Sequence, residues 1–132
     1  MKVDLSSAPK VLIVEDDVDT LGFFELLFSG SGFIVWGACT SGERAVELCE
    51  NSESPPDVVV LDYRLPGMDG VEVGKRLMEI DSTIEIILCT ADDSARESAE
   101  AVGIYRFKTK PVENAHLVKN IVKAYKNKLR RT

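Results

Sequence analysis

The sequence of 132 residues has a single histidine and only three cysteines, so it is poor in the side chains that bind transition metals. Cys39, Cys49 and Cys89 are odd in number and lack the spacing of a metal-binding motif. Because disulfides form mainly in oxidising compartments, reduced thiols in a cytoplasmic protein are the simplest interpretation. One histidine excludes a His-rich metal site.

Long apolar runs are also missing. No stretch reaches the length of about 18 apolar residues that a membrane-spanning helix needs, and residues 1–10 lack the apolar segment of a signal peptide. The hydrophobic fraction of 45% and the charged fraction of 29% are typical of a globular chain. We therefore expect one domain over residues 1–132, with a core from about 10 to 129 and no membrane association.

Charge is unevenly distributed. The net charge is −6, yet the last 21 residues carry six basic side chains and one acidic one. The acidic remainder argues against direct binding of nucleic acid. The basic end is most simply the solvated face and carboxyl end of a helix, where cations suit the helix dipole. Alternatively, it begins a linker helix to an output domain absent from this chain.

Apolar runs alternate with segments of helical periodicity along the whole chain. Five strands are expected, at residues 10–14, 33–39, 58–61, 85–89 and 105–107, and five helices, at residues 18–29, from 40–43 onward, 71–80, 93–102 and from 114 onward. Such alternation predicts an α/β fold: a doubly wound parallel sheet with helices on both faces and right-handed crossovers.

Several polar residues are placed to cap these helices. Asp17 and Asp69 precede the first and third helices, Thr40 and Glu43 have the pattern of a capping box, and Asn114 precedes the last helix. The helix over residues 93–102 has only small apolar residues, so we expect it to be the least firmly packed.

The first helix has more apolar residues than one buried face needs. Its helical stripe consists of Val18, Leu21, Phe24, Leu27 and Phe28. Phe23 and Leu26 widen this stripe, which indicates either a generous core helix or a patch for docking a partner.

Chemically useful side chains follow four of the predicted strands. Glu15 and Asp16 follow the first, Asp62 the third, Thr90 the fourth and Lys110 the fifth. These loops open on the same edge of a doubly wound sheet, so the side chains can converge there. Clustered carboxylates repel one another, and Mg²⁺ removes that conflict. A lysine and a threonine beside Mg²⁺ match the oxygens of a phosphoryl group, which a carboxylate can accept as a nucleophile.

Four motifs in this order carry a family resemblance. They are Val-Leu-Ile-Val-Glu-Asp-Asp at 11–17, Val-Leu-Asp-Tyr-Arg-Leu-Pro-Gly-Met-Asp-Gly at 60–70, Cys-Thr-Ala at 89–91 and Lys-Pro at 110–111. The chain resembles the receiver domain of response regulators in two-component and phosphorelay systems, of the chemotaxis-regulator type, from Lys10 to about Leu129. The resemblance implies a (βα)5 flavodoxin-like sheet of strand order 2-1-3-4-5.

The resemblance also implies roles for the acids. Asp62 would accept a phosphoryl group from the phosphohistidine of a sensor histidine kinase or a histidine phosphotransferase. Asp16 and Asp62 would bind Mg²⁺ directly, and Glu15 would help through water. The backbone carbonyl of Arg64 would be a further ligand. The chain would promote its own Mg²⁺-dependent phosphorylation and dephosphorylation without being a conventional enzyme.

Three further residues would read out the phosphorylation. Lys110 would pair with the phosphoryl oxygens, and Pro111 and the offset from Phe107 favour it over Lys108. Thr90 would turn its hydroxyl toward the phosphoryl group, and the rotamer of Phe107 would follow. The altered face, made by the fourth helix, fifth strand and fifth helix, would act on a downstream output domain or protein. Dimerisation through the fourth and fifth helices is compatible with the sequence.

Two other functions use similar residues. A phosphatase of the haloacid dehalogenase type also has a strand-end aspartate, but it needs a second aspartate where this chain has Arg64. A receiver-like binding module would work without phosphorylation, and the complete set of acids, threonine and lysine argues against it.

The side chains of Arg64 and Asp92 are expected to flank the phosphorylation site.

Overall fold

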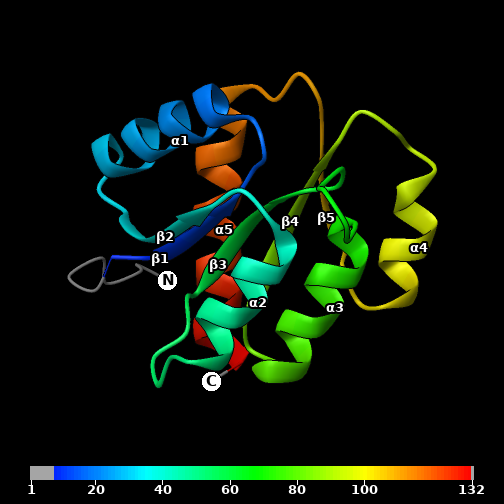
Figure 1. Ribbon diagram of the computed structural model, residues 1–132. Coiled ribbons are helices and arrows are strands. Elements are labelled where there is room, and N and C mark those ends of the chain that lie inside the picture. The colour runs from blue at the N-terminus through cyan, green and yellow to red at the C-terminus, as the bar shows by residue number, and fades with distance from the viewer. Residues whose placement is uncertain (1–7, 132) are drawn as a thin grey trace.

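A single sheet of five parallel strands forms the centre of the protein (Figure 1). The computed structural model describes residues 8–131, so residues 1–7 and 132 of the expected domain lie outside it. The strands are β1 (Lys10–Val14), β2 (Ile34–Cys39), β3 (Val58–Asp62), β4 (Glu85–Thr90) and β5 (Arg106–Thr109). Their order is β2-β1-β3-β4-β5, which confirms the predicted fold class.

Helices cover both faces of this sheet. They are α1 (Val18–Gly30), α2 (Gly42–Glu50), α3 (Gly70–Ile80), α4 (Ala95–Ala101) and α5 (Asn114–Arg131). Figure 1 shows α1 and α5 on one face and α2, α3 and α4 on the other. Among residues 8–131, no helix has the length and apolarity needed to cross a membrane.

The strands divide the apolar core into two clusters. Side chains alternate along β1, so Val11 and Ile13 face α1 and α5, whereas Leu12 and Val14 face α2 and α3. Every residue of β3 is buried, as the continuous apolar run predicted. Each such Val or Leu contributes about 1.5–3 kcal/mol by leaving water. Of the three thiols, Cys39 and Cys49 belong to the first cluster and Cys89 to the second.

Two of the predicted helix caps are confirmed. The carboxylate of Asp17 accepts a hydrogen bond from the backbone N–H of Thr20 at 3.1 Å. The carboxylate of Asp69 accepts one from the backbone N–H of Glu72 at 3.0 Å. Both aspartates satisfy backbone donors that the first helical turn leaves free. They thereby fix the starts of α1 and α3, the helices that follow β1 and β3.

Two other predicted caps are wrong. The capping box at residues 40–43 does not form, because Ser41 is the N-cap of α2 and accepts from the backbone N–H of Arg44 at 3.2 Å. The capping-box pattern favoured Thr40, which has Glu43 three residues later, but the backbone makes the neighbouring Ser41 the cap. Asn114 is the first residue of α5 and not its cap, since Leu117 N–H already donates to the carbonyl of Glu113 at 3.0 Å.

The segment between β4 and α5 differs from the prediction in its boundaries. Helix α4 spans seven residues, against the ten expected at 93–102. Strand β5 begins one residue later than expected and continues to Thr109. The buried residues of α4 are Ala95 and Ala99, so it buries little apolar area, as predicted.

Helix α1 exposes several large apolar side chains. Leu21, Phe24 and Phe28 are buried, but Phe23 is 48% exposed and Leu26 is 77% exposed. The interpretation as a generous core helix is therefore wrong for these two residues. The prediction that Val18 lies on the buried stripe is also wrong, because this residue, in the first turn of α1, is 69% exposed.

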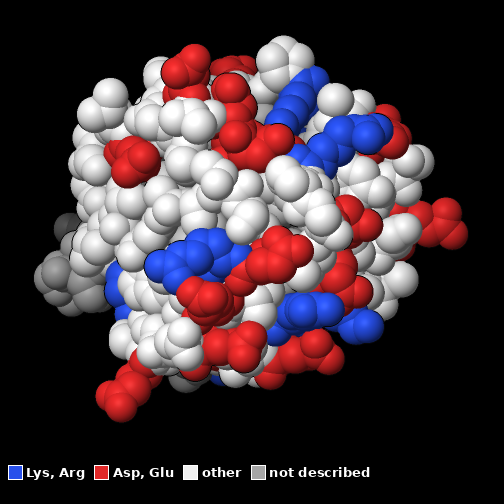
Figure 2. All heavy atoms as spheres, viewed as in Figure 1, with Lys and Arg blue, Asp and Glu red and all other residues white. Residues whose placement is uncertain are grey.

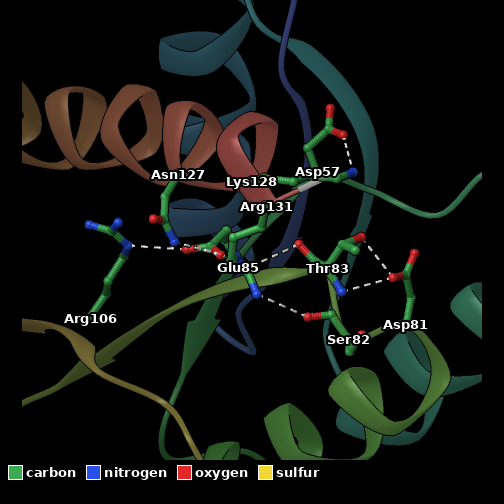
Figure 3. A network of polar contacts seen from close by, with 9 residues as sticks. All are labelled: Asp57, Asp81, Ser82, Thr83, Glu85, Arg106, Asn127, Lys128 and Arg131. Carbon is green, nitrogen blue, oxygen red and sulfur yellow. Dashed lines mark hydrogen bonds and ion pairs between the residues drawn. The ribbon is translucent and has the colours of Figure 1, made fainter.

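The basic end of α5 contacts the amino-terminal edge of the sheet, so it is not only a solvated face (Figure 3). Lys128 forms an ion pair with Asp57, which precedes β3, and Arg131 forms one with Glu85, the first residue of β4. The side chains of Asp57 and Glu85 are only 11% and 9% exposed, so these ion pairs neutralise buried charges. We call these four residues, together with Asn127, the α5 anchor.

Further hydrogen bonds complete the α5 anchor. Glu85 accepts from the Asn127 amide at 3.1 Å and lies 3.4 Å from Nε of Arg106 in β5. The Arg131 guanidinium also donates to the backbone carbonyls of Ser82 and Thr83, each at 3.3 Å. The anchor therefore joins the last turn of α5 to the starts of β3, β4 and β5.

Candidate active site

Four loops meet at the carboxyl-terminal edge of the sheet and bring together the side chains selected from the sequence. Glu15 and Asp16 follow β1, Asp62 ends β3, Thr90 ends β4, and Lys110 follows β5. Figure 2 shows acidic side chains at this upper edge of the molecule, with basic side chains beside them. Parallel strand order is what makes these separate sequence segments neighbours.

Three carboxylates form the acidic centre of the site. One oxygen from each of Glu15, Asp16 and Asp62 lies within 4.8 Å of the others. Glu15 is 5% exposed and Asp62 is 6% exposed, whereas Asp16 is exposed to solvent. Mg²⁺ prefers hard oxygen ligands and retains several waters, so one solvent-facing and two buried carboxylates fit such an ion. The donor set is therefore suited to Mg²⁺.

Lys110 lies directly against the buried acids. Its Nζ is 2.8 Å from Oδ1 of Asp62 and 3.8 Å from Oε1 of Glu15. Of the two lysines that the sequence offered, Lys110 is thus the one at Asp62. Burial alone would lower the pKa of Lys110, but its hydrogen bond to Asp62 and the negative charges of both acids raise it overall. Its ammonium group is fully charged at neutral pH.

Glu15 has an unusual proton affinity for a glutamate. Burial raises its pKa to about 7, and the charge of Asp62 adds to this, although the backbone N–H of Asp17 opposes it by donating to Glu15 at 3.1 Å. A cation bound between the carboxylates would favour the ionised form. Without one, Glu15 is partly protonated near neutral pH.

The hydroxyl of Thr90 is bonded to the loop between β4 and α4. It accepts from the backbone N–H of Asp92 at 2.9 Å and donates to the Asp92 carbonyl at 3.2 Å. The preceding Cys89 is buried, which raises the pKa of its thiol to about 12. That thiol is therefore a packing group.

Arg64 and Asp92 form an ion pair between two loops of the site. Arg64 Nη2 lies 3.6 Å from Oδ2 of Asp92, and the Arg64 side chain is 78% exposed. Hydrogen bonds from the hydroxyl and the backbone N–H of Ser94 lower the pKa of Asp92, and the Arg64 charge adds a smaller effect in the same direction. The sequence placed both side chains near Asp62, but nothing in the pattern indicated that they pair.

Gly70 allows the chain to fold back tightly beside Asp62. A Cβ at position 70 would lie 2.5 Å from the Asp62 carbonyl oxygen, and the Gly70 N–H donates to the Tyr63 carbonyl at 2.7 Å. Gly67 in the same loop has φ +77°, a conformation that favours glycine. In the sequence these residues served only as part of the motif at 60–70, whereas the structure shows that the two glycines position the Asp62 loop.

Phe107 lies in β5, three residues before Lys110, and is half-buried. Its ring packs at the margin of the core cluster on the α3 and α4 side. The guanidinium carbon of Arg96 in α4 lies 4.5 Å from the ring centroid. Sequence reasoning missed this contact, because the two residues belong to different elements and only the fold brings them together.

A cavity of about 410 Å³ lies beside the acids and opens onto α1. Its polar lining includes Asp16, Asp62 and Lys110, and its apolar lining includes Phe23 and Val112. The cavity therefore joins the charged centre of the site to apolar side chains of α1 and of the segment before α5.

Comparison with known proteins agrees with this geometry. Residues 11–122 match the response regulator receiver domain family. The chain is 32% identical to the chemotaxis protein CheY of Thermotoga maritima, over 89% of this chain and 98% of that protein. It is 33% identical to sporulation initiation phosphotransferase F of Bacillus subtilis, over 88% of this chain and 92% of that protein.

Solved structures and longer proteins are similar as well. The CheX-CheY-BeF3-Mg²⁺ complex of Borrelia burgdorferi contains a chain with a TM-score of 0.81 and 28% identity, covering 91% of this chain and 92% of that one. Some curated relatives are longer, and the chain spans 49% of the transcriptional regulatory protein PrrA of Mycobacterium leprae.

Proposed function

The chain belongs to the response regulator receiver domain family of two-component systems, and we propose that Asp62 is the residue on which it receives a phosphoryl group. The observation that carries this proposal is the position of one buried carboxylate. Asp62 ends a central strand, lies 2.8 Å from the Lys110 ammonium and is within 4.8 Å of oxygens from two further acids. We further propose that residues 1–132 are a single receiver domain.

Mg²⁺ is the cofactor that this donor set fits. Asp16 and Asp62 would bind it directly, the backbone carbonyl of Arg64 would complete the protein ligands, and Glu15 would act through water. The ion would neutralise the charge of the acids and of the incoming phosphoryl group.

The chain's own residues supply the chemistry. A carboxylate oxygen of Asp62 attacks phosphorus, a P–O bond forms, and the P–N bond of the phosphohistidine donor breaks with its electron pair going to the imidazole. Lys110 then pairs with a phosphoryl oxygen. The Thr90 hydroxyl leaves the Asp92 backbone and donates to another phosphoryl oxygen, and Phe107 follows it inward.

The phosphoryl donor is a sensor histidine kinase or a histidine phosphotransferase, docked against α1. Support comes from the cavity that joins Asp62 to Phe23 and Val112, and from the exposed Val18 and Leu26 on the same helix as Phe23. An apolar margin around a charged centre would exclude water from the transfer. The buried free thiols fit a cytoplasmic location for this exchange.

Phosphorylation would shift an existing equilibrium between two arrangements of the face formed by α4, β5 and α5. A downstream output domain or protein would bind one arrangement better than the other. The small apolar area that α4 buries supports its place in this face, because little packing holds it.

The deciding experiment measures intact mass after incubation with Mg²⁺ and a small acyl phosphate. We expect one labile phosphoryl increment on the native protein and none on Asp62→Asn, which removes the nucleophile and keeps the size of the side chain. A labile increment that persists on Asp62→Asn would refute the assignment of Asp62.

Two other results would point to the alternative functions. No increment together with no Mg²⁺ binding would favour a binding module that works without phosphorylation. Steady hydrolysis of a phosphate ester would favour a phosphatase. Mg²⁺ binding without an increment would contradict self-phosphorylation from small donors and would direct the test to a phosphohistidine protein.

A further inference from the structure

Helix α4 is held to the rest of the molecule by few contacts at its amino end. Ser94, its N-cap, makes no side-chain capping hydrogen bond. The residues that α4 buries are Ala95 and Ala99, whose methyl groups provide little apolar area. Individual polar contacts therefore count for more in placing α4 than they would for a helix with Leu or Phe on its inner face.

The contact between Arg96 and Phe107 is one of these. A distance of 4.5 Å from the guanidinium carbon to the ring centroid is within the range of about 6 Å for a cation–π interaction. Arg96 is exposed and Phe107 is half-buried, so the guanidinium covers ring surface that the core leaves open. An interaction of this kind at an exposed site changes an equilibrium by a factor of about two to five.

The second contact is the pair of hydrogen bonds between the Thr90 hydroxyl and the backbone of Asp92, at 2.9 and 3.2 Å. Asp92 lies in the loop that leads into α4. Both contacts depend on side chains that the proposed switch moves: Thr90 turns to the phosphoryl group, and Phe107 rotates. A movement at Asp62 would thus release α4 at two points.

We propose that Arg96 is a positioning residue of the switch, which holds Phe107 and the amino end of α4 in the unphosphorylated arrangement by stacking on the aromatic ring. This inference rests on the proposed function of Asp62. Arg96 would then help to keep the population of the active arrangement small before phosphorylation. Removing the cation should increase that population.

The test compares Arg96→Gln with Arg96→Lys. Glutamine has a helix propensity close to that of arginine, so the first variant removes the cation with little effect on α4 itself. We expect the rate of phosphorylation by a small acyl phosphate to rise by about two- to five-fold. Lysine keeps the charge and should hold the rate within about twofold of the native value. Glu100→Gln, at an exposed position on the same helix, is the matched control and should leave the rate unchanged.

A double-mutant cycle separates this role from a general effect on α4. Phe107→Leu removes the ring and retains an apolar side chain. In that background Arg96→Gln should change the rate by less than about 1.5-fold, because the partner of the cation is gone. An equal increase in both backgrounds would overturn the proposal, as would an unchanged rate in the native background.

Nuclear magnetic resonance tests the contact independently of phosphorylation. In the Mg²⁺-free protein, the side-chain protons of Arg96 should be shifted upfield by the ring, and Phe107→Leu should abolish that shift. An Arg96 without this shift would overturn the inference even if Asp62 accepts phosphate. A protein that takes no phosphoryl group but keeps the shift would contradict the proposed function and leave the stacking contact established.

Discussion

Glu15 and Asp62 are two buried carboxylates that the fold forces close together. Both residues are less than 7% exposed. Each has an oxygen within 4.8 Å of one from a third acid, Asp16, and Lys110 lies beside them. Burial and the neighbouring charge raise the pKa of Glu15 to about 7. Like charges held in a cavity destabilise the folded state, and active sites retain them because the chemistry requires them.

Replacing Glu15 with glutamine should therefore stabilise the metal-free protein. A folded pKa of about 7, above the ordinary 4.5, means that the folded state keeps a proton which the unfolded chain loses. The contribution of Glu15 to stability is thus full below pH 4.5 and is lost as pH rises through 7. Urea unfolding should show an advantage for Glu15→Gln that grows over this range to about 1–2 kcal/mol.

The exposed Glu50→Gln serves as the control, with a change within about 0.5 kcal/mol at every pH. An advantage of Glu15→Gln that shrinks as pH rises would contradict the raised pKa. Excess Mg²⁺ should reduce the advantage, since the ion favours the ionised carboxylate.

At the scale of single residues, the sequence predicted the identity of the site better than its contacts. Asp62 and Lys110 could be selected because strand ends are visible as the limits of apolar runs. The pairing of Arg64 with Asp92 could not, because a 3.6 Å contact between two loops depends on backbone paths that no periodicity encodes. The choice of Ser41 over Thr40 as a cap has the same cause.

Among the elements, helix α5 is held to the sheet both by an apolar face and by the ion pairs of the α5 anchor. Its apolar face, with Leu117, Ile121 and Tyr125 buried, follows helical spacing and was predictable. The α5 anchor was not, because Lys128 and Asp57 are 71 positions apart and Arg131 and Glu85 are 46 positions apart. A basic run at a helix end looks solvated in a sequence unless the acids it meets are known.

Arg131 and Arg130 provide a matched pair for testing the anchor. Arg131→Gln leaves Glu85 buried with one ion pair fewer, so we expect the free energy of unfolding to fall by about 1–2 kcal/mol. Arg130→Gln should change it by less than about 0.5 kcal/mol. Urea denaturation measures both values, and amide hydrogen exchange should show faster opening of the last turns of α5 in Arg131→Gln alone. Equal effects of the two substitutions would show that the anchor does not hold the helix.

In the whole molecule, the two edges of the sheet have opposite character. The amino-terminal edge has acids paired with the cations of α5, as Figure 3 shows. The carboxyl-terminal edge has three acids beside one lysine and is bordered by the loosely packed α4. Stability is concentrated at one edge and the capacity for chemistry and movement at the other.

This asymmetry predicts a stabilising effect of Mg²⁺ that acts through the acidic edge alone. At free Mg²⁺ about 100-fold above its dissociation constant, the free energy of unfolding should rise by about 2.7 kcal/mol. Thermal unfolding with and without a chelator measures the shift. Asp62→Asn should lose most of it, whereas Arg131→Gln should keep all of it. An equal loss in both variants would contradict a site confined to the carboxyl-terminal edge.

The division of the core into two clusters has a consequence for the three thiols. Cys39 and Cys49 lie on the α2 side and Cys89 on the α5 side, and burial raises their pKa values to about 11, about 11 and about 12. An alkylating reagent reaches none of them until the local structure opens and the thiolate forms. The alkylation rates of these thiols therefore report how often each half of the core opens, with two thiols on one side of the sheet and one on the other.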